Sequence, residues 1–306
     1  MRTRLFHRLT PARALRLGAA AIMLGASGLT AAVVAFGMFM SRPARAVIGP
    51  PPSDLSAEDV FISSASGASL HGWFVAGRSG GGAVVLMHGV RSNRLSMVAR
   101  ARLLSQAGFS VLLFDFQAHG DSTGTHITFG LLEGMDAGAA VGFVQQRLPA
   151  ERIGVIGASL GGAAALLGPA PLPIDALVLE SVYPDIEAAV SDRIRSTLGA
   201  PLGPWLAWPL ETLFEHVLPP VLDIDPAKLR PIDHIAEVGA PVLVASGERD
   251  DHTTIAEARD LFDHARNPKI FWAVPGAGHV DLESFAPEEY RRRVLPFLVG
   301  ALQRSR

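Results

Sequence analysis

Apolar residues along the chain fall into short runs that alternate with longer stretches of helical periodicity. Because short continuous apolar runs are typical of strands covered on both faces, they predict a mostly parallel sheet with helices on both sides. A leading hairpin over residues 58–64 and 69–76, turning near Gly67, brings the expected sheet to eight strands. The other strands are predicted at residues 83–87, 110–114, 153–156, 176–179, 242–245 and 269–274, and helices at 92–107, 131–147, 160–167, 254–265 and 287–304.

A long insertion interrupts this alternation after the sixth strand. About 60 residues separate Glu180, near the end of that strand, from Val242, which is about twice the length of an ordinary crossover connection. The stretch is rich in proline and tryptophan, and its apolar residues 206, 210, 213, 214 and 217 share one helical face. We expect a helical cap at about residues 183–235, over the C-terminal edge of the sheet. Its apolar face either packs the cap onto the sheet or lines a channel.

The N-terminal segment, residues 1–46, differs in composition from the rest of the chain. From Leu17 to Met40 it holds 24 residues without a charge. As a helix this stretch would be about 36 Å long and would span a ~30 Å hydrocarbon core with some tilt. By the positive-inside rule, the N-terminus is expected in the cytoplasm and the rest of the chain on the outer side of the membrane. Five arginines precede the stretch and two follow it, namely Arg2, Arg4, Arg8, Arg13, Arg16, Arg42 and Arg45.

A cleaved signal peptide is the alternative for this segment, since Ala44, Arg45 and Ala46 fit the small-x-small pattern of a cleavage site. The apolar stretch is longer than the roughly 7–15 residues typical of a signal peptide, which favours a transmembrane anchor. Cleavage after Ala46 would instead give a secreted protein. Residues 47–56, with three successive prolines, are expected to form a stiff spacer before a folded domain at 57–306.

Composition narrows the possible functions of the folded domain. Residues 47–306 hold 20 basic against 29 acidic residues, a formal charge of −9, which disfavours nucleic acid as a partner. The chain has no cysteine, so disulfides, thiolate nucleophiles and Cys-ligated zinc are excluded. Its glycine-rich turn has neither the spacing of a dinucleotide-binding loop nor a Walker lysine, and we expect no cofactor and no metal.

The segment GASLG at residues 157–161 matches the G-x-S-x-G pattern of a nucleophilic serine. An apolar strand precedes it and a helical stretch follows it, so Ser159 is placed at the sharp strand-to-helix turn that exposes such a serine. The neighbouring glycines leave room for that helix to pack close to the turn. The alternative is a glycine-rich turn with an inert serine.

A serine nucleophile needs a general base and an acid that orients it. His279 follows the last predicted strand in a glycine-rich loop, at the end of the chain order Ser, Asp or Glu, His. Asp250 follows a strand and a glycine turn, and there it could accept a hydrogen bond from one ring nitrogen of His279, fixing the tautomer and stabilising the imidazolium. Asp251 is the adjacent alternative, and Glu180, at the end of the preceding strand, is a less favoured one.

Acyl transfer also needs donors for the developing oxyanion. The backbone N–H groups of Val90, after the third strand, and Leu160, after the serine, are the candidates for this oxyanion hole. His88, in the same turn as Val90, is expected to bond the loop backbone. His252 and His264 lie in or beside a helical pattern and are expected on the surface.

With these residues placed, residues 57–303 resemble the α/β-hydrolase superfamily, in particular its serine aminopeptidase-like and monoacylglycerol-lipase-like hydrolases. Where that branch often has Arg-Gly before a His-Gly pair, this chain has Gln117 and Ala118. The departure lies outside the proposed triad, so it bears on the subfamily and not on the chemistry. The resemblance implies hydrolysis through an acyl-enzyme, and it implies that the insertion acts as a cap. The matching motifs are His88-Gly89, Phe114-Asp115, His119-Gly120-Asp121-Ser122, the Ser159 turn, Gly247-Glu248-Arg249-Asp250 and Gly278-His279.

The sequence therefore predicts a membrane-anchored serine hydrolase that cleaves carboxylic esters, with a small or lipid-like ester as its substrate. Peptide or amide hydrolysis by the same mechanism is the alternative. A non-catalytic binding module on the same fold is less favoured, because no member of the triad is missing. Dehalogenase or epoxide hydrolase chemistry would require a carboxylate in place of Ser159.

Overall fold

Eight strands form one sheet whose central members are buried on both faces, as their continuous apolar sequence predicts. The computed structural model describes residues 10–303, and for residue 14 and residues 200–207 it gives the backbone alone. The strand order is β10-β9-β8-β7-β4-β5-β3-β2, with β3 antiparallel to both neighbours and all other pairs parallel. The predicted mostly parallel sheet is confirmed. Its strands are β2 (Ala57–Ser63), β3 (Ser69–Val75), β4 (Ala83–Met87), β5 (Ser110–Phe114), β7 (Ile153–Ala158), β8 (Ala176–Glu180), β9 (Val242–Gly247) and β10 (Lys269–Val274).

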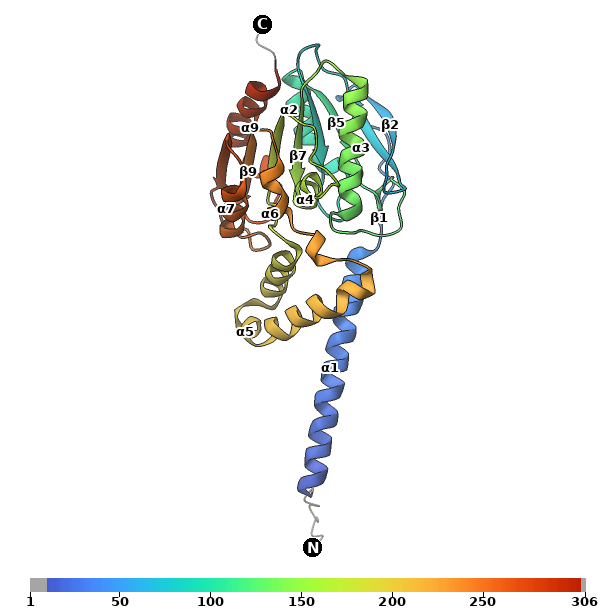
Figure 1. Cartoon of the computed structure of the whole chain (residues 1–306), viewed down its shortest axis with the longest axis vertical. Helices are drawn as coiled ribbons and strands as arrows, with labels where there is room; N and C mark the ends of the chain where they lie inside the picture. Colours follow the sequence, from blue (N-terminus) through green and yellow to red (C-terminus); the bar gives the residue numbers. More distant parts are fainter. Residues whose placement is uncertain (1–9, 304–306) are drawn as a thin grey trace.

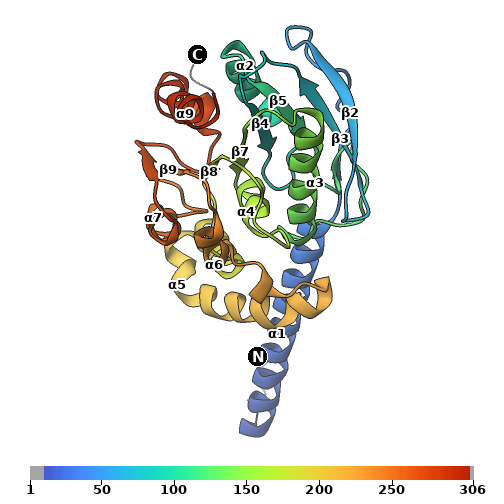
Figure 2. The same ribbon diagram turned by 45° about the horizontal axis from the view of Figure 1, so that its top comes forward.

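Helices cover both faces of this sheet and enclose two hydrophobic cores (Figure 1, Figure 2). Helices α3, α4 and α7 pack on one face, and α2 and α9 pack on the other. Successive residues of β4 alternate between the two cores, Val85 in one and Leu86 in the other, as a strand requires. The elements are α2 (Val98–Gln106), α3 (Leu131–Arg147), α4 (Leu160–Leu166), α6 (Pro231–His234), α7 (Ile255–His264), α8 (Leu282–Phe285) and α9 (Pro287–Leu302), with 3₁₀ turns η1 (Arg94–Met97), η2 (Pro226–Lys228) and η3 (Ile235–Glu237).

The insertion after β8 is helical, as predicted, and lies across one end of the sheet (Figure 1). Its main element is α5 (Ile186–Leu222), which bends at Gly199, where φ is +65°. A side chain is strained in that region of backbone space, and glycine is not. Strands β4, β7, β9 and β10 are parallel neighbours or near neighbours, so their carboxyl ends meet at one edge. The loops that carry the predicted site residues leave the sheet at that edge.

The N-terminal helix α1 (Pro11–Ser41) extends far beyond the sheet domain (Figure 1). It begins six residues before the predicted apolar stretch. This helix is long enough and apolar enough to cross a membrane. Most of its residues between 11 and 32 are exposed, whereas Val33 and Gly37 are buried. Arg2, Arg4 and Arg8, which contributed to the predicted orientation, lie outside the described residues.

The segment that joins α1 to the sheet domain is attached to that domain by hydrogen bonds. Strand β1 (Ala44–Arg45) pairs in parallel with β6 (His119–Gly120), a pairing that the sequence pattern did not indicate. The amide of Ala46 donates to the carbonyl of Gly120 at 3.0 Å, and that of Ile48 to Asp121 Oδ1 at 3.3 Å. The predicted boundary between residues 46 and 47 therefore falls inside a segment bonded to the domain.

Candidate active site

Ser159 occupies the sharp turn between β7 and α4. Its φ of +49° and ψ of −114° are sparsely populated for a residue with a side chain, and such strain is characteristic of functional turns. The turn is fixed by a hydrogen bond from the Ser159 amide to the carbonyl of Glu180 at 2.8 Å. A Cβ on Gly161 would lie 2.2 Å from the carbonyl oxygen of Met87, so only glycine lets α4 approach β4 this closely.

Asp250 and His279 come together from the loops after β9 and β10. The Nδ1 atom of His279 lies 2.9 Å from Asp250 Oδ2 and 3.1 Å from Oδ1. The amides of His252 and Thr253 each donate to Oδ1 at 2.9 Å. Burial alone would raise the pKa of Asp250, but the hydrogen bond and charge of His279 together with these amides hold it below its usual value. The carboxylate therefore stays ionised beside the imidazole.

Within the described part of the chain, the hydroxyl of Ser159 makes no hydrogen bond to His279. The two residues lie on loops at the same edge of the sheet, after β7 and β10. Hydrogen bonds between a nucleophile and its base are often long or poorly aligned when no substrate is bound. The structure thus brings the acid and the base into contact and leaves the serine hydroxyl unengaged.

The two alternative acids do not contact His279. The Asp251 side chain is 69% exposed, and the imidazole of His252 lies 3.9 Å from its carboxylate. Glu180 is buried and accepts hydrogen bonds from Arg100 at 2.5 and 3.3 Å and from the Tyr290 hydroxyl at 2.5 Å. Because the Glu180 carboxylate is bonded to Arg100 and Tyr290, it is part of the scaffold beneath the site and does not orient the base.

His252 lies closer to the site than the sequence indicates. Its ring centroid is 5.0 Å from that of His279, and its side chain is only 37% exposed. It is still partly exposed, but the loop after Asp250 folds back toward His279 before α7 begins, so this histidine lies beside the base, which the sequence did not indicate. Burial, followed by the charges of Arg193 and His279, lowers its pKa. His264, in contrast, is exposed at the end of α7, as expected.

Two backbone amides beside Ser159 have no hydrogen-bond acceptor among the described residues. One is the amide of Val90, in the loop after β4, and the other is that of Leu160, in the first turn of α4, where helices leave N–H groups unpaired. His88 fixes the loop backbone as expected: Nδ1 donates to the carbonyl of Gly89 at 2.8 Å, and Nε2 accepts from the amide of Phe116 at 3.1 Å. Burial lowers the pKa of His88 to about 3, so the ring is neutral.

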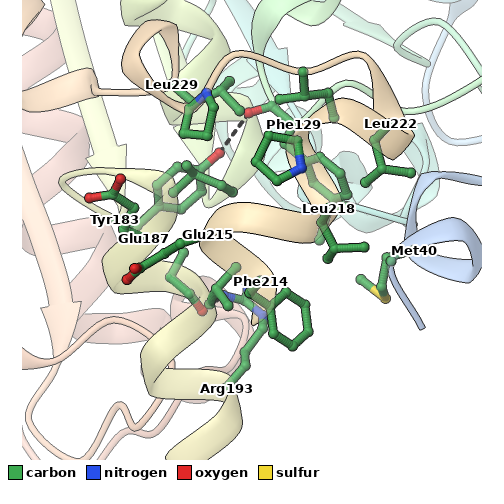
Figure 3. A pocket seen from close by; sticks show the side chains of 18 of the residues that line it. Met40, Phe129, Tyr183, Glu187, Arg193, Phe214, Glu215, Leu218, Leu222 and Leu229 are labelled. Atoms are coloured by element: carbon green, nitrogen blue, oxygen red, sulfur yellow. Dashed lines mark hydrogen bonds between the residues drawn. The ribbon is translucent and has the colours of Figure 1, made fainter. Parts of the chain in front are cut away.

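Ser159, Val90 and Leu160 line one largely apolar cavity of about 1040 Å³, its open mouth included. A concave site lined mostly by apolar side chains with a few polar groups is typical of small-molecule binding. Figure 3 shows Met40 of α1 beside Leu218 and Leu222 of α5 in its wall. The contribution of α1 was not predicted.

The predicted apolar face of the cap is divided between the cavity and other contacts. Phe214 lines the cavity, whereas Leu210, Leu213 and Val217 are half-buried and do not line it. The side chain of residue 206 lies outside the described part of the chain. Part of this face therefore lines the cavity, as one of the two interpretations requires.

The cap also brings charged groups to the site. Arg193 of α5 lines the cavity, and burial lowers the pKa of its guanidinium while the nearby hydroxyl of Tyr183 and the carboxylate of Asp250 raise it. Asp192, the neighbouring residue, is buried, and its Oδ2 has no hydrogen-bond donor in the described structure. It lies against Glu257 of α7, and burial together with this carboxyl neighbour raises the pKa of Glu257 to about 7. In its protonated form, the Glu257 carboxyl can therefore donate a hydrogen bond to the carboxylate of Asp192.

Within residues 10–303, no three His, Asp or Glu side chains are grouped in a way that would hold a metal ion. The chemistry available at the site is that of a strained serine, an imidazole paired with a buried carboxylate, two unpaired amide donors and an apolar cavity.

The model of the alpha/beta hydrolase family matches residues 84–293, so this chain belongs to that family. An uncharacterized protein of Mycobacterium tuberculosis is 35% identical over 243 residues, covering 77% of this chain and 78% of the relative. The alpha/beta hydrolase domain-containing protein WAV2 of Arabidopsis thaliana is 28% identical, covering 82% of this chain and 81% of that protein. Among solved structures, an esterase of Pyrococcus furiosus superposes with a TM-score of 0.67 at 27% identity, covering 86% of this chain and 97% of the esterase. The chain is a hydrolase by fold and by family.

Proposed function

We propose that the chain is a membrane-anchored serine hydrolase that cleaves carboxylic esters through an acyl-enzyme. The pairing of His279 Nδ1 with the buried carboxylate of Asp250 carries this proposal, because it leaves Nε2 of the imidazole as the proton acceptor. In this mechanism Nε2 takes the proton of the Ser159 hydroxyl as the oxygen attacks the ester carbonyl. The unpaired amides of Val90 and Leu160 then hold the developing oxyanion.

Ester specificity is supported by the apolar cavity and by the esterase among the structural neighbours. The tetrahedral intermediate formed by this attack collapses to the acyl-enzyme and releases the alcohol, which takes its proton from the imidazolium. Water, deprotonated by the same imidazole, then hydrolyses the acyl-enzyme and frees the acid. An acyl chain would occupy the apolar cavity during both steps.

Aminopeptidase activity at the same triad is the second candidate, and a specific feature favours it. Glu187 and Glu215 line the cavity, and a carboxylate near the acyl site could bind the free amino group of a peptide substrate (Figure 3). Comparing hydrolysis of p-nitrophenyl esters with that of aminoacyl anilides separates the two. We expect the ester to be the better substrate, with kcat/KM rising from acetyl to hexanoyl or octanoyl chains.

Anchoring by an uncleaved helix is supported by the attachment of residues 41–48 to the sheet domain. The Ser41 hydroxyl donates to the Ile127 carbonyl, and the Ile127 amide donates to the Ser41 carbonyl. Cleavage after Ala46 would remove these bonds and strand β1 from a folded domain. We propose that the N-terminus lies in the cytoplasm and the hydrolase domain on the outer side.

Covalent labelling with a fluorophosphonate tests the serine directly. The Ser159→Ala variant should neither be labelled nor hydrolyse p-nitrophenyl esters, while its thermal unfolding stays close to that of the parent protein. Ser284→Ala, an exposed serine near His279 in the sequence, is the matched control and should keep both properties. Labelling that persists in Ser159→Ala would assign the nucleophile to another residue, and no labelling of the parent protein would favour a binding module.

A further inference from the structure

The membrane-side helix α1 contributes side chains to the same cavity as Ser159. Phe36, Gly37 and Met40, which are one face of its last two turns, all line it. We propose that the end of α1 is a wall of the acyl pocket, and that the pocket takes its substrate directly from the membrane. The substrate is then an acyl ester dissolved in the bilayer. This inference rests on the ester hydrolase function proposed above.

The contact between α1 and α5 is close at this wall. A Cβ on Gly37 would lie 2.5 Å from Cδ2 of Leu218, so the absence of a side chain at residue 37 lets the two helices approach. Phe214 lies one turn of α5 before Leu218, and its ring packs edge to face against that of Phe36, with the ring centroids 6.1 Å apart. Since α5 forms another wall of the cavity, the pocket is enclosed between the anchor helix and the cap.

The end of α1 is held in a fixed position relative to the catalytic loops. The guanidinium of Arg91 donates to the carbonyls of Phe39 at 3.0 Å and Arg42 at 3.1 Å, and it lies 4.5 Å from the centroid of the Phe39 ring. A cation at a helix C-terminus stabilises these free carbonyls. Because Arg91 directly follows Val90, the same loop carries a proposed oxyanion donor and secures the anchor helix.

The depth of this wall follows from the length of α1. A span of about 20 residues crosses the ~30 Å hydrocarbon core. Counted from Leu17, where the uncharged stretch begins, about 20 residues reach Phe36. The pocket wall therefore begins where the hydrocarbon ends, and Arg42 follows at the level of the lipid headgroups.

The cap lies on the same side of the molecule. Figure 1 shows α5 on the side of the sheet from which α1 extends, beside the upper part of that helix. Trp208 of α5 is 74% exposed, and tryptophan favours the interface between hydrocarbon and water. With α1 and α5 in these positions, an acyl chain can pass from the bilayer into the cavity without crossing water, while its ester group stays at the level of Ser159.

Tryptophan substitutions on two neighbouring α1 residues test the wall. Met40→Trp narrows the cavity, whereas Met38→Trp, a 47% exposed residue that does not line it, is the matched control. Full-length proteins in lipid nanodiscs are assayed with acetyl and octanoyl p-nitrophenyl esters. Since each buried methylene is worth about a fourfold change, excluding two of them should lower the octanoyl-to-acetyl ratio of kcat/KM more than tenfold. Met38→Trp should change it less than about twofold, and Met40→Ala should shift the preference to longer chains.

These outcomes separate this inference from the proposed function. Acetyl hydrolysis retained in every variant, with an unchanged octanoyl-to-acetyl ratio in Met40→Trp and Met40→Ala, would overturn the pocket wall and leave the esterase intact. Absence of acetyl hydrolysis in the parent protein would instead refute the esterase.

Crosslinking tests the route from the bilayer without turnover. A lipid ester with a diazirine at the end of its acyl chain is incorporated into nanodiscs with full-length Ser159→Ala, and crosslinked peptides are identified by mass spectrometry. Crosslinks to Met40 and Leu218, inside the cavity, are expected. Crosslinks confined to the exposed surface of residues 17–32 would show that the lipid only surrounds the helix, and would overturn the proposal.

Discussion

Replacing Asp250 with asparagine changes one carboxylate oxygen into an NH₂ group at nearly constant shape. The effect depends on which way the amide faces. Oδ1 accepts hydrogen bonds from the amides of His252 and Thr253 at 2.9 Å each. The asparagine carbonyl oxygen must therefore take this position, because an NH₂ group there would face two other N–H donors. The new NH₂ group is therefore directed at Nδ1 of His279, which now has to accept a hydrogen bond.

This orientation fixes the wrong tautomer of the imidazole. With Nδ1 as acceptor, the ring proton moves to Nε2, the nitrogen that has to take the proton of Ser159. The charge that stabilises the imidazolium is lost as well. A wrong tautomer in a Ser-His-Asp triad lowers kcat about 10⁴-fold, which corresponds to about 5 kcal/mol of transition-state stabilisation. Because both backbone hydrogen bonds survive, the variant should fold and its Tm should fall only slightly.

The assay is kcat for p-nitrophenyl ester hydrolysis by the purified full-length protein, with thermal unfolding measured in parallel. Asp251→Asn is the control, since its exposed carboxylate does not touch His279, and it should retain kcat within about twofold. A folded Asp250→Asn variant within tenfold of the parent protein would refute the tautomer argument. A larger loss in Asp251→Asn would move the acid by one residue.

Three further predictions concern stability and the N-terminal helix. Glu180→Ala removes one of the two carboxylates that pair with the buried guanidinium of Arg100 and leaves Asp281 at 2.6 Å, so it should lower the free energy of unfolding by about 2–3 kcal/mol in denaturant titrations. Glu58→Ala, whose ion pair is exposed, should lower it by less than about 1 kcal/mol. Because the pKa of Glu257 beside Asp192 is raised to about 7, the folded state binds the proton more tightly than the unfolded state. Stability should therefore fall as pH rises from about 4.5 towards 7, and Glu257→Gln should flatten the dependence of Tm on pH relative to the parent protein; equal slopes would contradict this. Full-length protein should stay in the membrane through a high-salt wash, because the helix is held by burial and not by charge, whereas soluble protein beginning at Val47 would reveal cleavage.

Local sequence patterns were sufficient to locate most of the secondary structure. The strands Ala83–Met87, Ser110–Phe114 and Lys269–Val274 and the helix Leu131–Arg147 have the predicted bounds. Each consists of residues whose apolar spacing matches a single element, so neighbours in the sequence supply the whole signal. The helix after Ser92 differs, since a 3₁₀ turn occupies its start.

The pairing of Asp250 with His279 was also accessible from sequence, for a topological reason. Both residues follow strands of a parallel sheet, and the carboxyl ends of such strands meet at one edge, so the order of strands and loops alone brings them near each other. The position of His252 was not accessible, because it depends on how the loop before α7 folds back toward the sheet.

The sequence by itself determined the elements, the serine turn and the apolar length of the N-terminal helix. Only the tertiary structure decided that Met40 lines the cavity, that β1 pairs with β6, and that the carboxyls of Asp192 and Glu257 meet. In each case the partners are more than 60 residues apart in the chain. A periodic pattern records which face of an element is buried, but it does not record what covers that face, and this is settled only when helices and loops pack against one another.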